Sequence, residues 1–221
     1  MTTAFPGAID AFTNPTATDA LDSATVPHAA QHANINDAVE AIETYLLAQN
    51  FGLTSGLYYS PTRSSSSSLT VTFQTTYYVP IVFNDTNTFD RISIATGASY
   101  SGTGAVRLGI YNNDSTTGKP STVLLDAGTV ATTAASTNYE ITISQSLSAG
   151  AYWLAFCVQT APTIANFVNL NGTTGVGFIV STTGVTFNAG AWTQTGVAGA
   201  FATAGTLVSA SNIPSVALRA S

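Results

Sequence analysis

The segment AYWLAFCVQ, residues 151–159, decides the fold class, because it carries apolar side chains on both faces of an extended chain. A strand with one face in solvent alternates apolar and polar residues, whereas a strand covered on both faces is an almost continuous apolar run. We therefore expect residues 151–158 to form a central β-strand that is buried on both faces. Trp153 then belongs to the core. Cys157 is the single cysteine, so it has no partner for an internal disulfide, and we expect a buried, unreactive thiol.

Shorter segments on both sides of this run alternate apolar and polar residues with a period of two. The clearest example is Val106, Leu108 and Ile110, which have small or charged neighbours. The expected strands cover residues 69–73, 77–83, 89–95, 105–111, 123–130, 139–144, 151–159, 165–170, 177–181 and 215–219. About ten short antiparallel strands separated by turns predict a mainly β fold, a jelly-roll-like β-sandwich over residues 69–221. The Gly-, Ala- and Thr-rich residues 172–211 do not reveal where their strands lie.

One segment near the N-terminus has the periodicity of an α-helix. Residues 27–51 place ring and apolar side chains at alternating spacings of four and three. Such a heptad seam is typical of helices that pack on copies of themselves, and its β-branched residues favour three or four chains over two. The seam residues are His28, His32, Ile35, Val39, Ile42 and Leu46. We expect a homo-oligomer, preferably a trimer; the other interpretation is an amphipathic helix packed against its own domain.

The segments on either side of this helix have no clear period. Residues 1–26 are rich in Ala, Thr, Pro and Asp, and they predict an extended arm. Residues 52–68 end in a run of serines from Ser64 to Ser68, and they predict a linker that contains the domain boundary.

The charge of the chain excludes several classes of partner. Charged residues make up 7% of the chain, and residues 1–62 contain no Lys or Arg, so they carry the whole net charge of −6. Because no basic patch is present, we expect no nucleic-acid partner. No apolar run reaches the ~18 residues of a membrane span, so we expect no membrane insertion. The N-terminus also lacks the basic and apolar regions of a signal peptide, which predicts synthesis in a cytoplasm without the usual export.

The sequence contains no constellation typical of an enzyme. The only histidines lie in the helix, and no cysteine or suitably placed acid completes a metal site with them in one chain. We expect no catalytic residues, no metal and no cofactor. The group Asn112–Asn113–Asp114 predicts a turn rather than a calcium loop. Tyr100 and Trp192 are flanked by glycines and are candidates for glycan contact; the alternative is that each fills the sandwich or a subunit interface.

Two blocks of the sequence resemble proteins of tailed bacteriophages. The HxxxH spacing from His28, followed by NINDAVEAIE, resembles a short helical motif of their structural proteins. Residues 91–130 and 141–159 resemble a jelly-roll module of phage fibre and virion-surface proteins, through the segments RLGIYNN, GKPSTVLL and LSAGAYWLA. The resemblance implies a homotrimeric, non-enzymatic structural protein of the phage particle, namely a tail or head fibre, a spike or a capsid decoration.

The same resemblance implies where the protein acts and with what. It would be located in the virion, attached to other virion structural proteins through its N-terminal region, with the sandwich facing outward. The alternative is a receptor-binding adhesin that recognises a host surface polysaccharide. Both roles use one fold, and a fold alone does not determine a function.

Overall fold

The structure is a computed structural model that describes residues 35–42, 53–61, 68–171, 191–210 and 212–221. The chain divides into two compact units, residues 1–52 and residues 53–221. Within the first unit, residues 35–42 are α-helical. The described helices include none long and apolar enough to cross a membrane.

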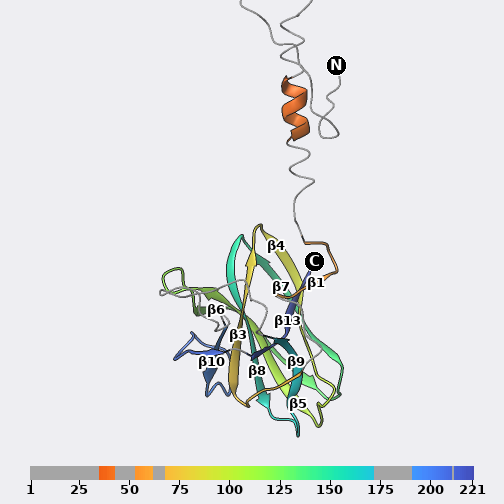
Figure 1. Ribbon diagram of the computed structural model, residues 1–221, viewed down its shortest axis with the longest axis vertical. Coiled ribbons are helices and arrows are strands. Elements are labelled where there is room, and N and C mark those ends of the chain that lie inside the picture. The colour runs from red at the N-terminus through yellow and green to blue at the C-terminus, as the bar shows by residue number, and fades with distance from the viewer. Residues whose placement is uncertain (1–34, 43–52, 62–67, 172–190, 211) are drawn as a thin grey trace, which may run out of the picture. The chain divides into compact units, whose positions relative to one another are not determined.

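The second unit is built from β-strands (Figure 1). In chain order they are β1 (Tyr58–Tyr59), β2 (Ser68–Thr70), β3 (Thr75–Phe83), β4 (Asn87–Ala95), β5 (Gly104–Asn113), β6 (Pro120–Thr132), β7 (Asn138–Leu147), β8 (Gly150–Thr160), β9 (Asn166–Asn171), β10 (Ala191–Thr195), β11 (Val208–Ala210), β12 (Asn212–Pro214) and β13 (Val216–Ala220).

These strands form two main antiparallel sheets. One sheet has the order β1-β13-β4-β7, and the other has the order β11-β10-β3-β8-β5-β6; a small third sheet has the order β12-β9-β2. The chain passes repeatedly from one main sheet to the other: β3 lies in the six-stranded sheet, β4 in the four-stranded sheet, β5 and β6 in the six-stranded sheet, and β7 in the four-stranded sheet. This crossing order is that of a jelly roll, which confirms the predicted fold class.

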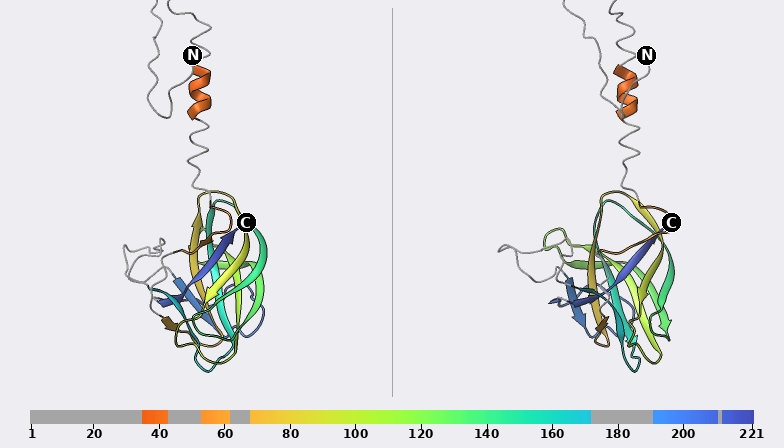
Figure 2. Two further views of the ribbon diagram at one scale, coloured as in Figure 1. Left: turned by 90° about the vertical axis from the view of Figure 1, so that its right-hand side faces the viewer. Right: turned by 45° about the vertical axis from the view of Figure 1, so that its right-hand side comes forward.

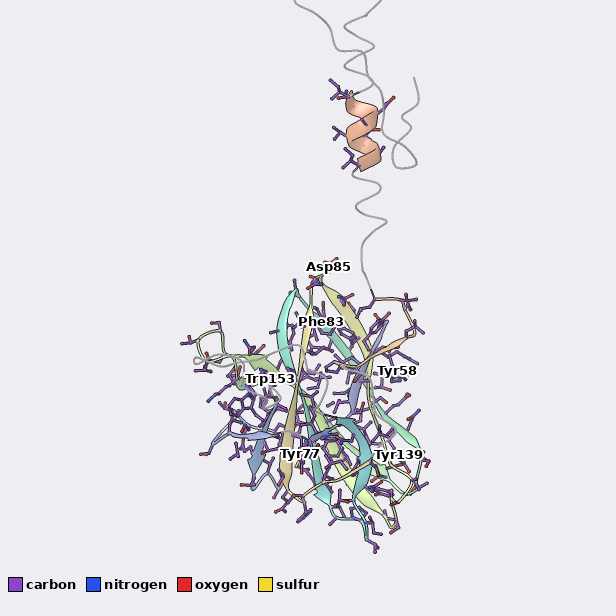
Figure 3. All side chains as sticks on the ribbon, in the orientation of Figure 1. Tyr58, Tyr77, Phe83, Asp85, Tyr139 and Trp153 are labelled. Atoms are coloured by element: carbon purple, nitrogen blue, oxygen red, sulfur yellow. The ribbon has the colours of Figure 1, made fainter. Side chains whose placement is uncertain are left out.

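The main core lies between the two sheets, and the alternation of the strands explains it. Tyr77, Val79 and Ile81 point from β3 toward the same side as Phe83, and Figure 3 shows Tyr77 and Phe83 near the two ends of this strand. The other strands contribute in the same way. The inward residues of β4, β5, β8 and β13 are Phe89, Ile92, Ile94, Val106, Leu108, Ile110, Leu154, Phe156, Val158, Val216 and Leu218.

A second apolar cluster covers the other face of the six-stranded sheet, and it makes β8 buried on both sides as predicted. Trp153, Ala155 and Cys157 alternate with the inward residues of β8, and they pack with Tyr78 and Tyr111. Trp153 is 1% exposed, and its indole N–H donates to Asn113 Oδ1 at 2.9 Å. Cys157 is buried as expected, and its burial raises the pKa of its thiol to about 11.

Residues 196–207, which we call the strap, contribute to this second cluster. Phe201 is 8% exposed and packs edge-on against Tyr111, with ring centroids 5.7 Å apart. Its backbone N–H donates to Asp126 Oδ2 at 3.1 Å, and the same carboxylate accepts from Arg107 Nη1 at 2.8 Å. A Cβ at Gly109 would lie 2.5 Å from the Leu125 carbonyl oxygen and 2.8 Å from the Phe201 ring, so only glycine fits between them. Both packing and polar contacts therefore hold the strap in place.

The structure differs from the sequence-based expectation in the segment before the sandwich. Residues 52–68 were expected to form a linker, but β1 pairs with β13, with Tyr58 opposite Arg219. The C-terminal end of β13 lies beside β1 (Figures 1 and 2). Residues 53–61 therefore belong to the sandwich unit rather than to a linker, while the boundary between the two units, after residue 52, falls within the range in which the domain boundary was expected. Residues 1–34, 43–52, 62–67 and 172–190, including the expected strand 177–181, lie outside the described residues.

Candidate functional site

The outer face of the four-stranded sheet carries a cluster of charged side chains. Arg219 binds the Asp90 carboxylate with two hydrogen bonds, from Nε at 2.8 Å and from Nη2 at 2.6 Å. Arg91 forms two longer ion pairs, from Nη1 to Asp90 Oδ2 at 3.7 Å and from Nε to Glu140 Oε2 at 3.8 Å. The Tyr58 hydroxyl donates to the second Glu140 oxygen at 2.5 Å. Two guanidinium groups and two carboxylates therefore neutralise one another, and Tyr58 joins the end of the network.

A β-bulge explains why Asp90 reaches this face. The pairing of β4 with β13 shifts between Arg219 and Ala220, which leaves Asp90 as an extra residue on β4. A bulge turns two consecutive side chains to the same side of a sheet. Phe89 and Ile92 are both 0% exposed, so Asp90 and Arg91 between them face outward together. The Asp90 carboxylate is thereby positioned beside the guanidinium of Arg219.

The cluster shifts the pKa of several of its members. The hydrogen bonds from Arg219 are the main reason why the pKa of Asp90 lies below its ordinary value of 3.8, and the same pairing raises the pKa of Arg219. Burial, followed by the hydrogen bond to Glu140, raises the pKa of Tyr58. At neutral pH the Asp90–Arg219 pair is therefore charged and Tyr58 is a neutral hydrogen-bond donor.

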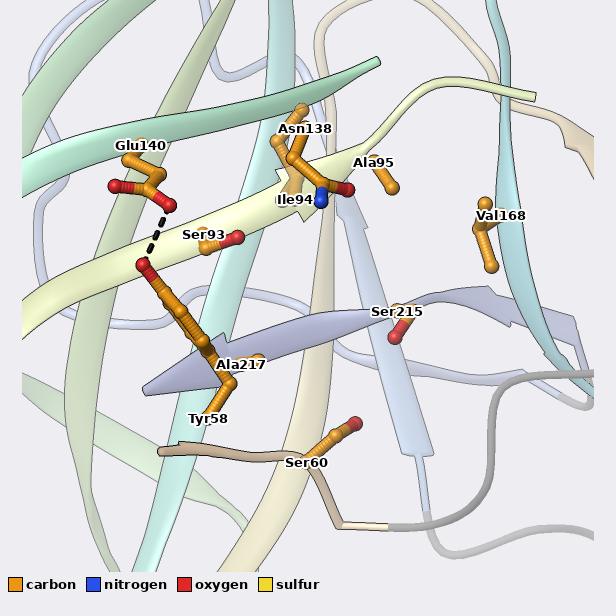
Figure 4. Close-up of a pocket in the computed structure, with 10 residues that line it drawn as sticks. All are labelled: Tyr58, Ser60, Ser93, Ile94, Ala95, Asn138, Glu140, Val168, Ser215 and Ala217. Atoms are coloured by element: carbon orange, nitrogen blue, oxygen red, sulfur yellow. Dashed lines mark hydrogen bonds between the residues drawn. The ribbon is translucent and has the colours of Figure 1, made fainter. Parts of the chain in front are cut away.

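A groove of about 640 Å³ lies next to this cluster (Figure 4). Its floor is formed by short side chains at paired positions, because Ala217 lies opposite Ser93 across β13 and β4. Figure 4 shows the Tyr58 side chain extending across the sheet toward Glu140 at one end of the groove. The lining residues are Tyr58, Ser60, Ser93, Ile94, Ala95, Asn138, Glu140, Val168, Ser215 and Ala217. Most of the polar groups that line it are hydroxyls and amides.

Tyr100, one of the two residues predicted to contact glycan, has no free face for stacking. Its side chain is 4% exposed and packs edge-on against Phe167, with ring centroids 5.6 Å apart. Its hydroxyl lies 3.0 Å from the Thr132 carbonyl oxygen and 2.6 Å from the Thr132 hydroxyl. The structure thus contradicts a glycan contact at Tyr100, because the ring fills the sandwich.

Trp192, the other predicted glycan contact, is half-buried on β10. It packs beside the second apolar cluster, and the Lys119 ammonium lies 4.4 Å from the centroid of its ring. A cation over the ring occupies a face that a sugar would need for stacking. The structure therefore places Trp192 mainly in packing, and the glycan hypothesis for Trp192 stays a prediction.

The turn predicted at Asn112–Asn113–Asp114 lies later in the chain, because Asn112 and Asn113 belong to β5 and the turn covers residues 115–117, after Asp114. Asp114 Oδ1 accepts from the backbone N–H groups of Thr116 and Thr117 at 2.8 and 3.1 Å, and these bonds lower the pKa of Asp114. Within the described residues, no three His, Cys, Asp or Glu side chains are grouped to hold a metal ion.

The described part of the helix exposes its predicted seam. Ile35 is 55% exposed, Val39 is 48% exposed and Ile42 is 43% exposed in the single chain. The remaining seam residues, His28, His32 and Leu46, lie outside the described residues. Three apolar side chains at heptad spacing are thus exposed on the helix taken by itself.

Comparison with protein-family models, with curated proteins and with solved structures finds no match to this chain.

Sequence reasoning missed the groove and the ion cluster, although one signal was present. Apolar residues in the β4 segment are spaced by three from Phe89 to Ile92 and then by two to Ile94. A break of this kind in a strand pattern indicates a bulge, and it marks Asp90 and Arg91 as neighbours on one face. No comparable signal marks Tyr58, because the two-residue strand β1 is too short to show a period.

Proposed function

We propose that this chain is a non-enzymatic structural protein of a bacteriophage particle, a tail or head fibre, a spike or a capsid decoration. In this role the N-terminal region attaches the chain to other virion proteins and associates with copies of itself, while the β-sandwich is displayed. The proposal that the chain belongs to a phage particle rests on the segments that resemble phage proteins. The exposed seam of the helix is the single observation that carries the assembly step.

The seam supports association because burial of its apolar side chains is favourable. Val39 and Ile42 expose nearly half of their side chains, and burying such a side chain contributes about 1.5–3 kcal/mol when complete. A heptad spacing brings these residues to one side of the helix, where three copies can enclose them. Burial of this side by partner helices therefore stabilises the helix, since helices in proteins gain most of their stability from the packing of an apolar face.

The sandwich supports a structural rather than a catalytic role. Its polar side chains on the four-stranded sheet form closed ion pairs, and the groove beside them holds one carboxylate, Glu140, already bonded to Tyr58 and Arg91. The two titratable side chains that line the groove, Tyr58 and Glu140, are hydrogen-bonded to each other.

The assembly step is tested by the mass of the full chain in solution. Multi-angle light scattering at micromolar concentration is expected to give a trimer of 22.6 kDa chains. Val39→Asp places a charge in the seam and is expected to yield monomers, whereas Ala41→Asp, outside the seam, is the matched control and is expected to remain assembled. A monomeric wild-type chain, or equal behaviour of both variants, contradicts the assembly step.

The proposed location of the chain in a phage particle is tested by a separate experiment. An antibody raised against residues 53–221 is expected to label the surface of intact phage particles, on a fibre, a spike or the capsid. A chain that is missing from purified particles contradicts the virion role, whatever its oligomeric state.

A further inference from the structure

The groove on the four-stranded sheet is built into the strand register. Ser93 pairs with Ala217 on β13 and with Glu140 on β7, and Ala95 pairs with Asn138 on β7. The short side chains therefore lie on the middle strands, and the longer ones lie on the flanking strand. This arrangement hollows the sheet face, and its volume falls in the range of about 300–1,000 Å³ that is typical of small-ligand sites.

The lining chemistry selects the class of ligand. Ser93 and Ser215 offer hydroxyls, Asn138 offers an amide, and Glu140 offers a carboxylate acceptor. Hydroxyl and amide groups both donate and accept hydrogen bonds. An apolar ligand would remove these groups from water without replacing their hydrogen bonds, which costs roughly 1–3 kcal/mol for each group. The groove is therefore suited to a ligand that carries many hydroxyls.

The charges around the groove exclude an anionic ligand. Arg91 and Arg219 are the nearest cations, and both are engaged with Asp90, Arg91 also with Glu140. An incoming phosphate, sulfate or carboxylate would have to displace these pairs and would meet the Glu140 carboxylate. A ligand without charge encounters no such opposition.

We propose that this groove binds a neutral oligosaccharide. Sugar hydroxyls would pair with the serine hydroxyls, the Asn138 amide and the free lone pairs of Glu140, while Ala95 and Ala217 contact the apolar C–H faces of the ring. Tyr58 forms the end wall, and its bond to Glu140 holds both groups in position before the ligand arrives. This site is distinct from Tyr100 and Trp192, and it does not rest on the proposed assembly of the chain.

The experiment is a printed array of neutral oligosaccharides, with sialylated and sulfated oligosaccharides as the anionic arm, probed with the full chain. Binding to neutral glycans is expected. Ala217→Leu fills the groove and is expected to weaken this binding at least tenfold, whereas Thr142→Leu, on the same face but outside the groove, is expected to leave it within about twofold. Asn138→Ala, which changes an exposed wall residue, gives a second test that does not challenge folding.

Several outcomes overturn the proposal. Binding to no array glycan contradicts it, and so does binding confined to the anionic arm. Neutral binding that survives both Ala217→Leu and Asn138→Ala contradicts the groove as the site. None of these outcomes changes the mass of the chain in solution, so a failure here is distinguishable from a failure of the proposed assembly.

Discussion

Phe201→Ala tests whether the strap is an integral part of the sandwich. The ring is 8% exposed, packs on Tyr111, and lies close to Gly109, so the substitution leaves a space beside both. Truncation of a buried Phe to Ala costs about 3–5 kcal/mol in a rigid core. Because the strap is not part of a strand and can relax into the space, we expect a loss near the lower end, about 3 kcal/mol.

The assay uses the two tryptophans of the chain as reporters. Trp153 belongs to the second apolar cluster and Trp192 packs against it, so both sense the strap. Urea unfolding followed by tryptophan emission measures the free energy of unfolding. Acrylamide quenching in the native state measures access to Trp153, which is 1% exposed in the wild-type protein. We expect Phe201→Ala to lower the free energy of unfolding and to increase the quenching of Trp153.

Phe73→Ala is the matched control, because it makes the same change at a side chain that is 45% exposed. We expect it to cost less than about 1 kcal/mol and to leave quenching unchanged. If Phe201→Ala falls within about 0.5 kcal/mol of Phe73→Ala and quenching stays at the wild-type level, the strap does not stabilise the sandwich and the reasoning fails.

Three further predictions concern single groups. Tyr100→Phe removes a buried hydroxyl and its hydrogen bonds to Thr132, and it should lower the free energy of unfolding by about 1–2 kcal/mol. Tyr152→Phe removes a hydroxyl whose hydrogen bond is exposed, and it should cost less than about 0.5 kcal/mol. Equal losses for the two variants in urea titrations would contradict this. Cys157 should resist a thiol reagent at about pH 8 in the folded protein and react at once in denaturant, because burial raises the pKa of its thiol to about 11. Rapid labelling of the native chain would contradict this and show that the second apolar cluster opens. The pKa of Asp90 is lower in the folded state than its ordinary value of 3.8. The stability that the Asp90 carboxylate contributes is therefore present above about pH 4 and is lost as the pH falls through the pKa of the folded state. Arg219→Met should flatten this dependence of the free energy of unfolding on pH, and an unchanged pH profile would contradict the pairing.

The sandwich was predictable where side-chain alternation is strict. Val106, Leu108 and Ile110 lie at 0% exposure on one face of β5, and the double-sided run at residues 151–158 lies in β8 between two apolar clusters. Periodicity reports which face of a strand is buried, so it succeeds wherever a strand has neighbours on both sides. The element bounds shifted by a few residues, as in β6, which runs from Pro120 to Thr132 rather than over 123–130.

The candidate site was not predictable, because long-range register creates it. β1 has two residues, and Tyr58 acquires its role only by pairing with Arg219, far away in the chain. The strands β10, β11 and β12 were also missed, since segments of three to five residues are too short to show a period. Tyr100 shows the opposite error: flanking glycines suggested an exposed loop, but its ring is enclosed by the core.

The cations of the described residues explain how the sandwich can have so few charges and still form specific contacts. Arg107 binds Asp126, which in turn holds the strap, and Arg219 binds Asp90 beside β1. Partly exposed pairs of this kind contribute little stability, typically about 0–1 kcal/mol each. Their consequence is positional: the Arg107–Asp126 pair holds the strap through Asp126, and the Arg219–Asp90 pair joins β13 to β4 and keeps the guanidinium near the Tyr58 ring of β1. The same pairing leaves the surface around the groove without a free cation among the described residues, so recognition there must come from hydroxyls, amides and shape.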